Sequence, residues 1–241
     1  MRPKIIQKTK PSSQKTGKVI IFDSGTLISF SMNGLLDVLK DLKGIFNGRF
    51  LITEGVKKEI IDKPLTIKRF ELEALKLKQL LEEGIIELPE AIGVGQDEIN
   101  RGAEEILEVS NKTFFGGGKD IEIIHFGEAE SLSLSKILTK KGIDNVIAID
   151  ERTTRVLVEK PENLKKILGK KLHIQINSKN ENYNFFKGYK IIRSPELAYV
   201  AYKKGLIKIR DQRLLDALLY AMKFKGAAIS GDEIREILRI G

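Results

Sequence analysis

Acidic residues directly follow two short apolar segments of the sequence. Residues 19–22 (VIIF) precede Asp23, and residues 146–149 (VIAI) precede Asp150. Such short, continuous apolar runs are typical of strands that are buried on both faces of a parallel sheet. In an open α/β sheet, ligands bind outside the carboxyl ends of the strands. If the two strands are neighbours, we therefore expect both carboxylates to face one crevice.

Two further acids are placed to join them. Glu59 lies in the short helix expected after an apolar segment at residues 50–52, and Glu128 opens the helix that begins in FGEAE. Buried like charges are costly unless a cation offsets them, and carboxylate oxygens suit hard Mg²⁺ or Mn²⁺. Any one of the four acids alone is more often a helix or turn cap, so the prediction of a metal site depends on their joint order.

Alternating strands and helices must position these acids. The alternation predicts an α/β fold with a mainly parallel central sheet. Beyond residues 19–22, 50–52 and 146–149, strand-like runs occur at 85–88, 172–176 and 189–192. A glycine loop is expected at 116–118. Helices are expected after residue 26 and at 53–61, 67–82, 97–109, 128–138, 151–159, 161–169, 195–204, 211–223 and 232–239.

Composition narrows the classes of function. The 241 residues contain no cysteine, which excludes disulfides, iron–sulfur clusters, cysteine-bound zinc and cysteine nucleophiles. The net charge of +9 favours an anionic partner, nucleic acid above all. The sequence shows no apolar run of transmembrane length and no secretory signal, so we expect a cytoplasmic protein without a membrane partner.

Four blocks of the sequence resemble the PIN domain family over roughly residues 18–158. In chain order they are VIIFDSGTLI, FLITEGVKKEII, GEAESLSLSKIL and VIAIDERTTR. Near the C-terminus, the segment GYKIIRSPELAYVAYKKGLI and the helix pair after it resemble the tail of one branch of the family. Residues 1–16 are then expected to form a flexible basic tail, residues 17–160 a PIN-like nuclease domain, and residues 161–241 a helical extension packed on that domain.

The resemblance implies a three-layer α/β/α sandwich and a Mg²⁺ or Mn²⁺ site. By position, both the catalytic and the metal-binding residues would be Asp23, Glu59, Glu128 and Asp150. The family often has Asp at the third position, where this chain has Glu128. The implied activity is hydrolysis of RNA phosphodiester bonds, which leaves a 5′-phosphate. The family also implies that a homodimer is a candidate assembly.

Other residues are weaker candidates for substrate binding. Ser24 is either a phosphate ligand or a turn hydroxyl, and Arg155 either pairs with a site acid or lies on the surface. Residues 165–193 mix lysines, including Lys187 and Lys190, with four aromatic residues. Basic residues neutralise phosphates and aromatic rings stack on unpaired bases, so this segment is a candidate RNA surface. The alternative, which is slightly favoured, is that the aromatic rings belong to the core.

Two other functions remain open from the sequence. The first is a non-catalytic RNA-binding or assembly module on the same fold. The second is a haloacid dehalogenase-like phosphatase, because DSGTL after a strand is similar to that family's Asp-x-Asp-Gly-Thr motif, although the second Asp is missing. Ser230-Gly231-Asp232-Glu233 is similar to a later motif of those phosphatases, but it is explained more simply as a helix capping box.

Overall fold

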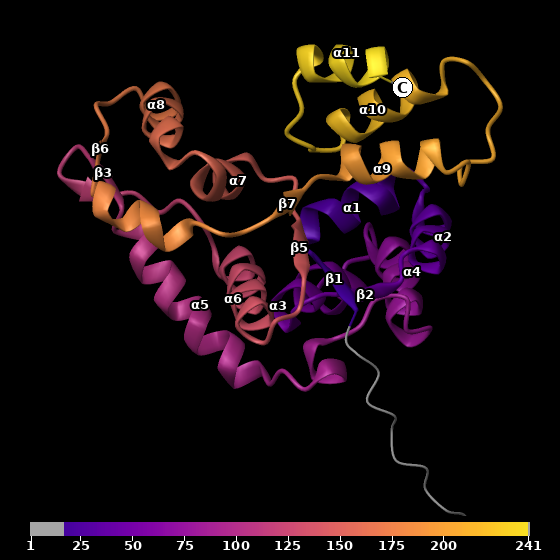
Figure 1. The fold of residues 1–241 in the computed structure, drawn as a ribbon, viewed down its shortest axis with the longest axis horizontal. Helices are drawn as coiled ribbons and strands as arrows, with labels where there is room; N and C mark the ends of the chain where they lie inside the picture. The colour runs from indigo at the N-terminus through magenta and orange to yellow at the C-terminus, as the bar shows by residue number, and fades with distance from the viewer. Residues whose placement is uncertain (1–16, 241) are drawn as a thin grey trace, which may run out of the picture.

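The computed structural model describes residues 17–240, so the predicted tail at 1–16 lies outside the described residues. The prediction of an α/β fold with a parallel sheet is confirmed. The central sheet has four strands in the order β2-β1-β5-β7 (Figure 1). These strands are β1 (Lys18–Phe22), β2 (Gly48–Leu51), β5 (Asn145–Ala148) and β7 (Ile191–Ile192).

The strand order of the central sheet reverses beside Asp23. From β1 the chain moves to β2 on one side, and it later returns to add β5 on the other side of β1. Phe22 at the end of β1 is paired with Ala148 at the end of β5, and the Asp23 N–H donates to the Ala148 carbonyl at 2.9 Å. The strand order reverses between β1 and β5, which is where α/β sheets bind their ligands.

Helices cover both faces of the sheet because the side chains of its strands alternate. Along β1, Val19 and Ile21 contribute to one core cluster, whereas Ile20 and Phe22 contribute to the other. The first cluster is completed by α5 (Gln96–Asn111), α6 (Phe126–Lys140), α7 (Arg152–Glu159) and α8 (Pro161–Leu172). The second is completed by α1 (Ser24–Met32), α2 (Leu36–Ile45), α4 (Glu71–Glu82), α9 (Ser194–Lys203) and α10 (Leu214–Phe224). The last helix, α11 (Gly231–Ile240), packs on α10 (Figure 1).

Shorter helices, turns and strands lie in the connections between these main elements. After β2 come α3 (Glu54–Lys57), the π-helical turn η1 (Lys58–Asp62) and the 3-10 turns η2 (Pro64–Thr66) and η3 (Pro89–Ile92). A small antiparallel sheet, which the sequence did not predict, has the order β4-β3-β6. It consists of β3 (Phe114–Gly116), β4 (Lys119–Asp120) and β6 (Asn177–Ser178), and the 3-10 helix η4 (Asn180–Phe186) follows it. None of the helices within residues 17–240 has the length and apolar character needed to cross a membrane.

Two predicted strands differ from the structure. Residues 85–88 make only one parallel bridge, between Leu51 and Glu87, and Pro89 then starts a 3-10 turn. Proline lacks the N–H that a longer ladder would need. Residues 172–176 do not form a strand, because α8 continues to Leu172 and β6 begins only at Asn177. The glycine loop is the turn between β3 and β4, where Gly117 and Gly118 both have positive φ angles, as a tight hairpin requires.

Candidate functional site

Asp23 is a buried carboxylate at the junction between β1 and α1. It caps α1, because its Oδ2 accepts a hydrogen bond from the Gly25 N–H at 3.3 Å, and the residue is only 5% exposed. Burial, then the charge of Glu128 and, more weakly, that of Glu59 raise the pKa of Asp23 from 3.8 to about 7. The backbone amides of Gly25 and Ser24 act in the opposite direction. Glu128 and Glu59 therefore lie near enough to Asp23 to act on its charge.

Glu59 is carried by a distorted helix. Thr53 begins it, as predicted, by accepting the Val56 N–H on its side chain. The helix then widens into a π turn, in which the Lys63 N–H donates to the Lys58 carbonyl at 3.0 Å. Such π turns occur frequently at functional sites. A Cβ atom added to Gly127 would lie 3.8 Å from Glu59 Oε2, so Glu59 lies beside the first turn of α6.

Glu128 lies in that first turn of α6. Its Oε2 accepts a hydrogen bond from the His125 N–H at 3.1 Å, and the residue is half-buried. A carboxylate at this place is also stabilised by the helix dipole. Glu128 therefore has one observed structural role, at the start of α6, besides its electrostatic effect on Asp23.

Glu130, two residues further along α6, is a buried acid that links two elements near Glu59 and Glu128. It is 2% exposed, and its carboxylate accepts hydrogen bonds from the Gly55 N–H at 2.8 Å and from Gln96 Nε2 at 2.6 Å. The contact is so close that a Cβ atom on Gly55 would lie 2.0 Å from Glu130 Oε2. Glu130 thus joins α3 to α6; η1, which carries Glu59, directly follows α3, and α6 carries Glu128. Gly55, a glycine in the first turn of a predicted helix, was the feature of the sequence that could have indicated this close contact.

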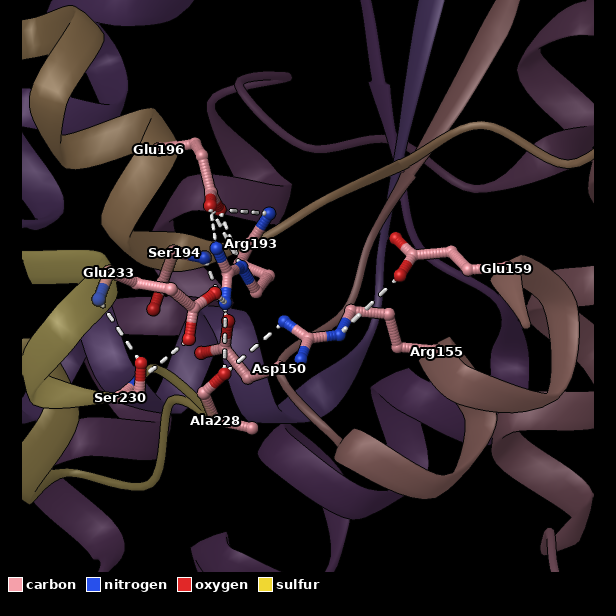
Figure 2. Close-up of polar contacts among 9 residues, drawn as sticks. All are labelled: Asp150, Arg155, Glu159, Arg193, Ser194, Glu196, Ala228, Ser230 and Glu233. Carbon is pink, nitrogen blue, oxygen red and sulfur yellow. Dashed lines mark hydrogen bonds and ion pairs between the residues drawn. The ribbon is translucent and has the colours of Figure 1, made fainter. Parts of the chain in front are cut away.

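Asp150 is turned toward other partners. It is 3% exposed, its Oδ1 accepts the Ser194 N–H at 2.7 Å, and its Oδ2 accepts the Ser29 hydroxyl at 3.1 Å. Its carbonyl oxygen accepts the Ala228 N–H at 3.3 Å. Gly25 lies between the two strand-end acids, since a Cβ there would be 3.5 Å from Asp23 Oδ2 and 3.8 Å from Asp150 Cβ. Asp150 is therefore a neighbour of Asp23 whose carboxylate ties the end of β5 to α9, as Figure 2 shows, and also to α1 through Ser29.

Arg155 bonds to the C-terminal segment and forms no observed pair with the four acids in the described part of the chain. Its guanidinium donates to the Ala228 carbonyl at 3.2 Å and lies 3.9 Å from Glu159. Arg193 donates to the same carbonyl at 2.9 Å and to Glu233 at 2.8 Å (Figure 2). The two arginines thereby attach the chain between α10 and α11 to α7 and to the end of β7. Ser24 is buried in the first turn of α1.

The aromatic residues of the basic segment belong to the core. Phe186 is fully buried, Tyr183 stacks on Phe114 with ring centroids 6.0 Å apart, and Phe185 lies under the ammonium group of Lys136. These contacts favour the core interpretation over stacking on RNA bases. Lys187 is exposed. Lys190 pairs with Asp144 at 2.6 Å, and Asp144 precedes β5, so this pair lies at the amino end of the sheet, opposite the acids.

Comparisons with protein-family models, with curated proteins and with solved structures find no match. The capping-box interpretation of Ser230 and Glu233 is confirmed by two reciprocal hydrogen bonds of 3.1 and 2.8 Å. The neighbouring Asp232 has a side chain that is 82% exposed and pairs with Arg235. The later phosphatase-like motif is therefore explained by a helix cap.

The acids around Asp23 have the right chemistry for a hard cation, but their side chains are not arranged around a single ion. All their donors are carboxylate oxygens, as Mg²⁺ and Mn²⁺ prefer, and an added cation would offset the charge that raises the pKa of Asp23. Across residues 17–240, however, no three acidic or histidine side chains are arranged as ligands of a single ion. Glu59 is exposed and Glu128 is half-buried, so neither side chain is enclosed by the core as Asp23 is.

Proposed function

We propose that this protein is a metal-dependent endoribonuclease with a PIN-like fold, which hydrolyses RNA phosphodiester bonds at the acids around Asp23. One observation carries the proposal: Asp23 is buried at the point where the strand order reverses, and the charged side chains that act on it are both carboxylates. Burying like charges together is unfavourable without a cation. The strongly positive net charge of +9 supports an anionic substrate.

In this proposal, Asp23, Glu59 and Glu128 hold Mg²⁺ or Mn²⁺. When bound, such an ion supplies charge neutralisation for phosphate oxygens and lowers the pKa of water. The Gly25 N–H orients Asp23, and Glu130 holds α3 against α6 so that Glu59 and Glu128 stay near each other. Asp150 contributes as a ligand only if its carboxylate leaves Ser29 and Ser194. In the observed arrangement it positions β5, α1 and α9.

A second candidate is a non-catalytic RNA-binding or assembly module. It is favoured by the same two facts that weaken a four-acid site: both Asp150 carboxylate oxygens are already bonded, and the described acids are not arranged as a ligand set. Such a module would bind RNA through lysines such as those of residues 165–193, and its binding would not depend on Asp23.

Cleavage of structured and unstructured RNA distinguishes the two candidates. We expect the native protein to cleave with Mn²⁺, to be inactive with EDTA, and to leave 5′-phosphate ends. Asp23→Asn and Glu128→Gln should abolish cleavage, whereas Glu122→Gln, an exposed acid before α6, should not. RNA binding without cleavage under all conditions would support the module instead, and the absence of both binding and cleavage would refute both candidates.

A further inference from the structure

An apolar groove lies beside Glu59, one of the candidate site acids. It has a volume of about 450 Å³, which is within the range of small-molecule sites. Its walls come from α1, η1 and α4, and we call it the α1–α4 groove. The side chains that matter for recognition are Ile28, Ser31, Met32, Ile60, Phe70 and Leu77. Glu59 also lines the groove, so the groove and the candidate metal centre share a side chain.

The groove contains a polar group without a partner. Ser31 is 6% exposed, and its Oγ is buried and has no hydrogen-bond partner among the described residues. Most buried polar side-chain atoms in proteins are hydrogen-bonded, so an orphaned hydroxyl in a groove wall points to a ligand with a hydrogen-bonding edge.

The rim of the groove offers exposed surfaces suited to a flat, apolar ligand. Phe70 is 46% exposed and Met32 is 52% exposed. The Arg69 guanidinium lies 5.5 Å from the centroid of the Phe70 ring. Aromatic rings and arginine planes are the surfaces on which proteins stack unpaired bases. The exposed Lys63, just before Pro64 of the groove wall, adds a positive charge for a phosphate.

We propose that the α1–α4 groove binds a nucleobase of the RNA substrate, next to the phosphodiester that is cleaved. This inference rests on the proposed nuclease function, and it narrows the substrate to single-stranded or locally unpaired RNA. A base presents two apolar faces for Phe70 and Met32 and a hydrogen-bonding edge for Ser31. In a duplex those faces are stacked and the edge is paired, so a base within a double helix cannot bind in the groove.

The test compares RNA binding by matched variants of the full chain. Affinity for a single-stranded oligonucleotide and for the same sequence in a perfect duplex is measured in EDTA, so that the RNA stays intact. Phe70→Ala should weaken single-strand binding by about fivefold or more, and Ser31→Ala should weaken it by a smaller factor. The control is Phe224→Ala on α10, where the phenylalanine is 78% exposed, and it should leave the affinity unchanged. None of these variants should change duplex binding.

Photo-crosslinking gives a second readout that needs no variant. A single-stranded RNA containing 4-thiouridine should crosslink to peptides that contain Met32 or Phe70. Equal affinity of Phe70→Ala and the native protein, or crosslinks confined to other peptides, would overturn the proposal. It would also be overturned if Phe70→Ala changed only the mass of the particle in solution, because the groove would then be occupied by a second copy of the chain.

The two proposals fail separately. Metal-dependent cleavage that is lost in Asp23→Asn, together with unchanged single-strand binding by Phe70→Ala, would retain the nuclease and reject the base site. Groove-dependent binding of single strands, without cleavage by the native protein, would reject the nuclease and retain the base site.

Discussion

Replacing Asp23 by Asn should stabilise the metal-free protein while removing its function. Burial and the two nearby carboxylates raise the pKa of Asp23 from 3.8 to about 7. One pKa unit corresponds to about 1.4 kcal/mol, so ionised Asp23 lowers the free energy of unfolding by up to roughly 4 kcal/mol. Asn removes the charge and keeps the helix cap, because Asn and Asp are equally good at that position.

The effect of Asp23→Asn on the free energy of unfolding should depend on pH. The folded-state pKa lies above the unfolded value, so the contribution of Asp23 to stability is fully present below about pH 4 and is lost as the pH rises through 7. The advantage of Asp23→Asn should therefore be near zero at pH 4 and greatest at pH 8. It is measured as the difference in free energy of unfolding from urea titrations in EDTA at several pH values.

Asp150→Asn is the matched control, since Asp150 is equally buried but accepts two hydrogen bonds. It should destabilise the protein, because the new amide group would turn an N–H toward a donor, either the Ser194 N–H or the Ser29 hydroxyl. Opposite signs for the two variants at pH 8 would support this description of the two acids. An Asp23→Asn protein that is less stable than the native protein at pH 8, or whose difference from it does not change with pH, would refute it.

Three further predictions concern the supports of the site. Glu130→Ala should reduce the free energy of unfolding by about 2–4 kcal/mol, because the half-buried Gly55 N–H and Gln96 both lose a charged acceptor. A loss below about 0.5 kcal/mol would show that the contact is dispensable. Gly55→Ala should destabilise the native protein more than it destabilises Glu130→Ala, since the added Cβ meets the carboxylate, and a double-mutant cycle in urea without coupling would contradict this. Ser230→Ala should cost about 1 kcal/mol through loss of the cap of α11, measured by thermal unfolding; an unchanged midpoint would show that the cap contributes nothing.

The sequence predicted the parts of the fold that depend on local patterns. Both strand-end acids, the Thr53 cap and the helices of the C-terminal region follow from apolar runs, capping residues and helical periodicity. The small antiparallel sheet was not predicted, because β4 and β6 have only two residues each, and β6 pairs with β3 from about 60 residues further along the chain. Pairing between distant segments leaves little signal in so short a run.

The sequence did not predict the directions of the acidic side chains. Glu128 and Glu59 act electrostatically on Asp23, but the described acids are not arranged as ligands of one ion, so the four-acid site stays a prediction. The carboxylate of Asp150 is directed by Ser194, 44 residues further along the chain, and by Ser29. No local pattern encodes either contact. Likewise, the role of Glu130 depends on the approach of α3 to α6, which only the packed structure shows.

The most direct test of the acidic site is the binding of Mn²⁺, followed by electron paramagnetic resonance at pH 8. The native protein should bind Mn²⁺, and Asp23→Asn and Glu128→Gln should lose that binding while remaining folded by circular dichroism. Exposed Glu122→Gln should bind like the native protein. If Asp23→Asn bound Mn²⁺ as tightly as the native protein, or if the native protein bound none, the carboxylates around Asp23 would not be a metal centre.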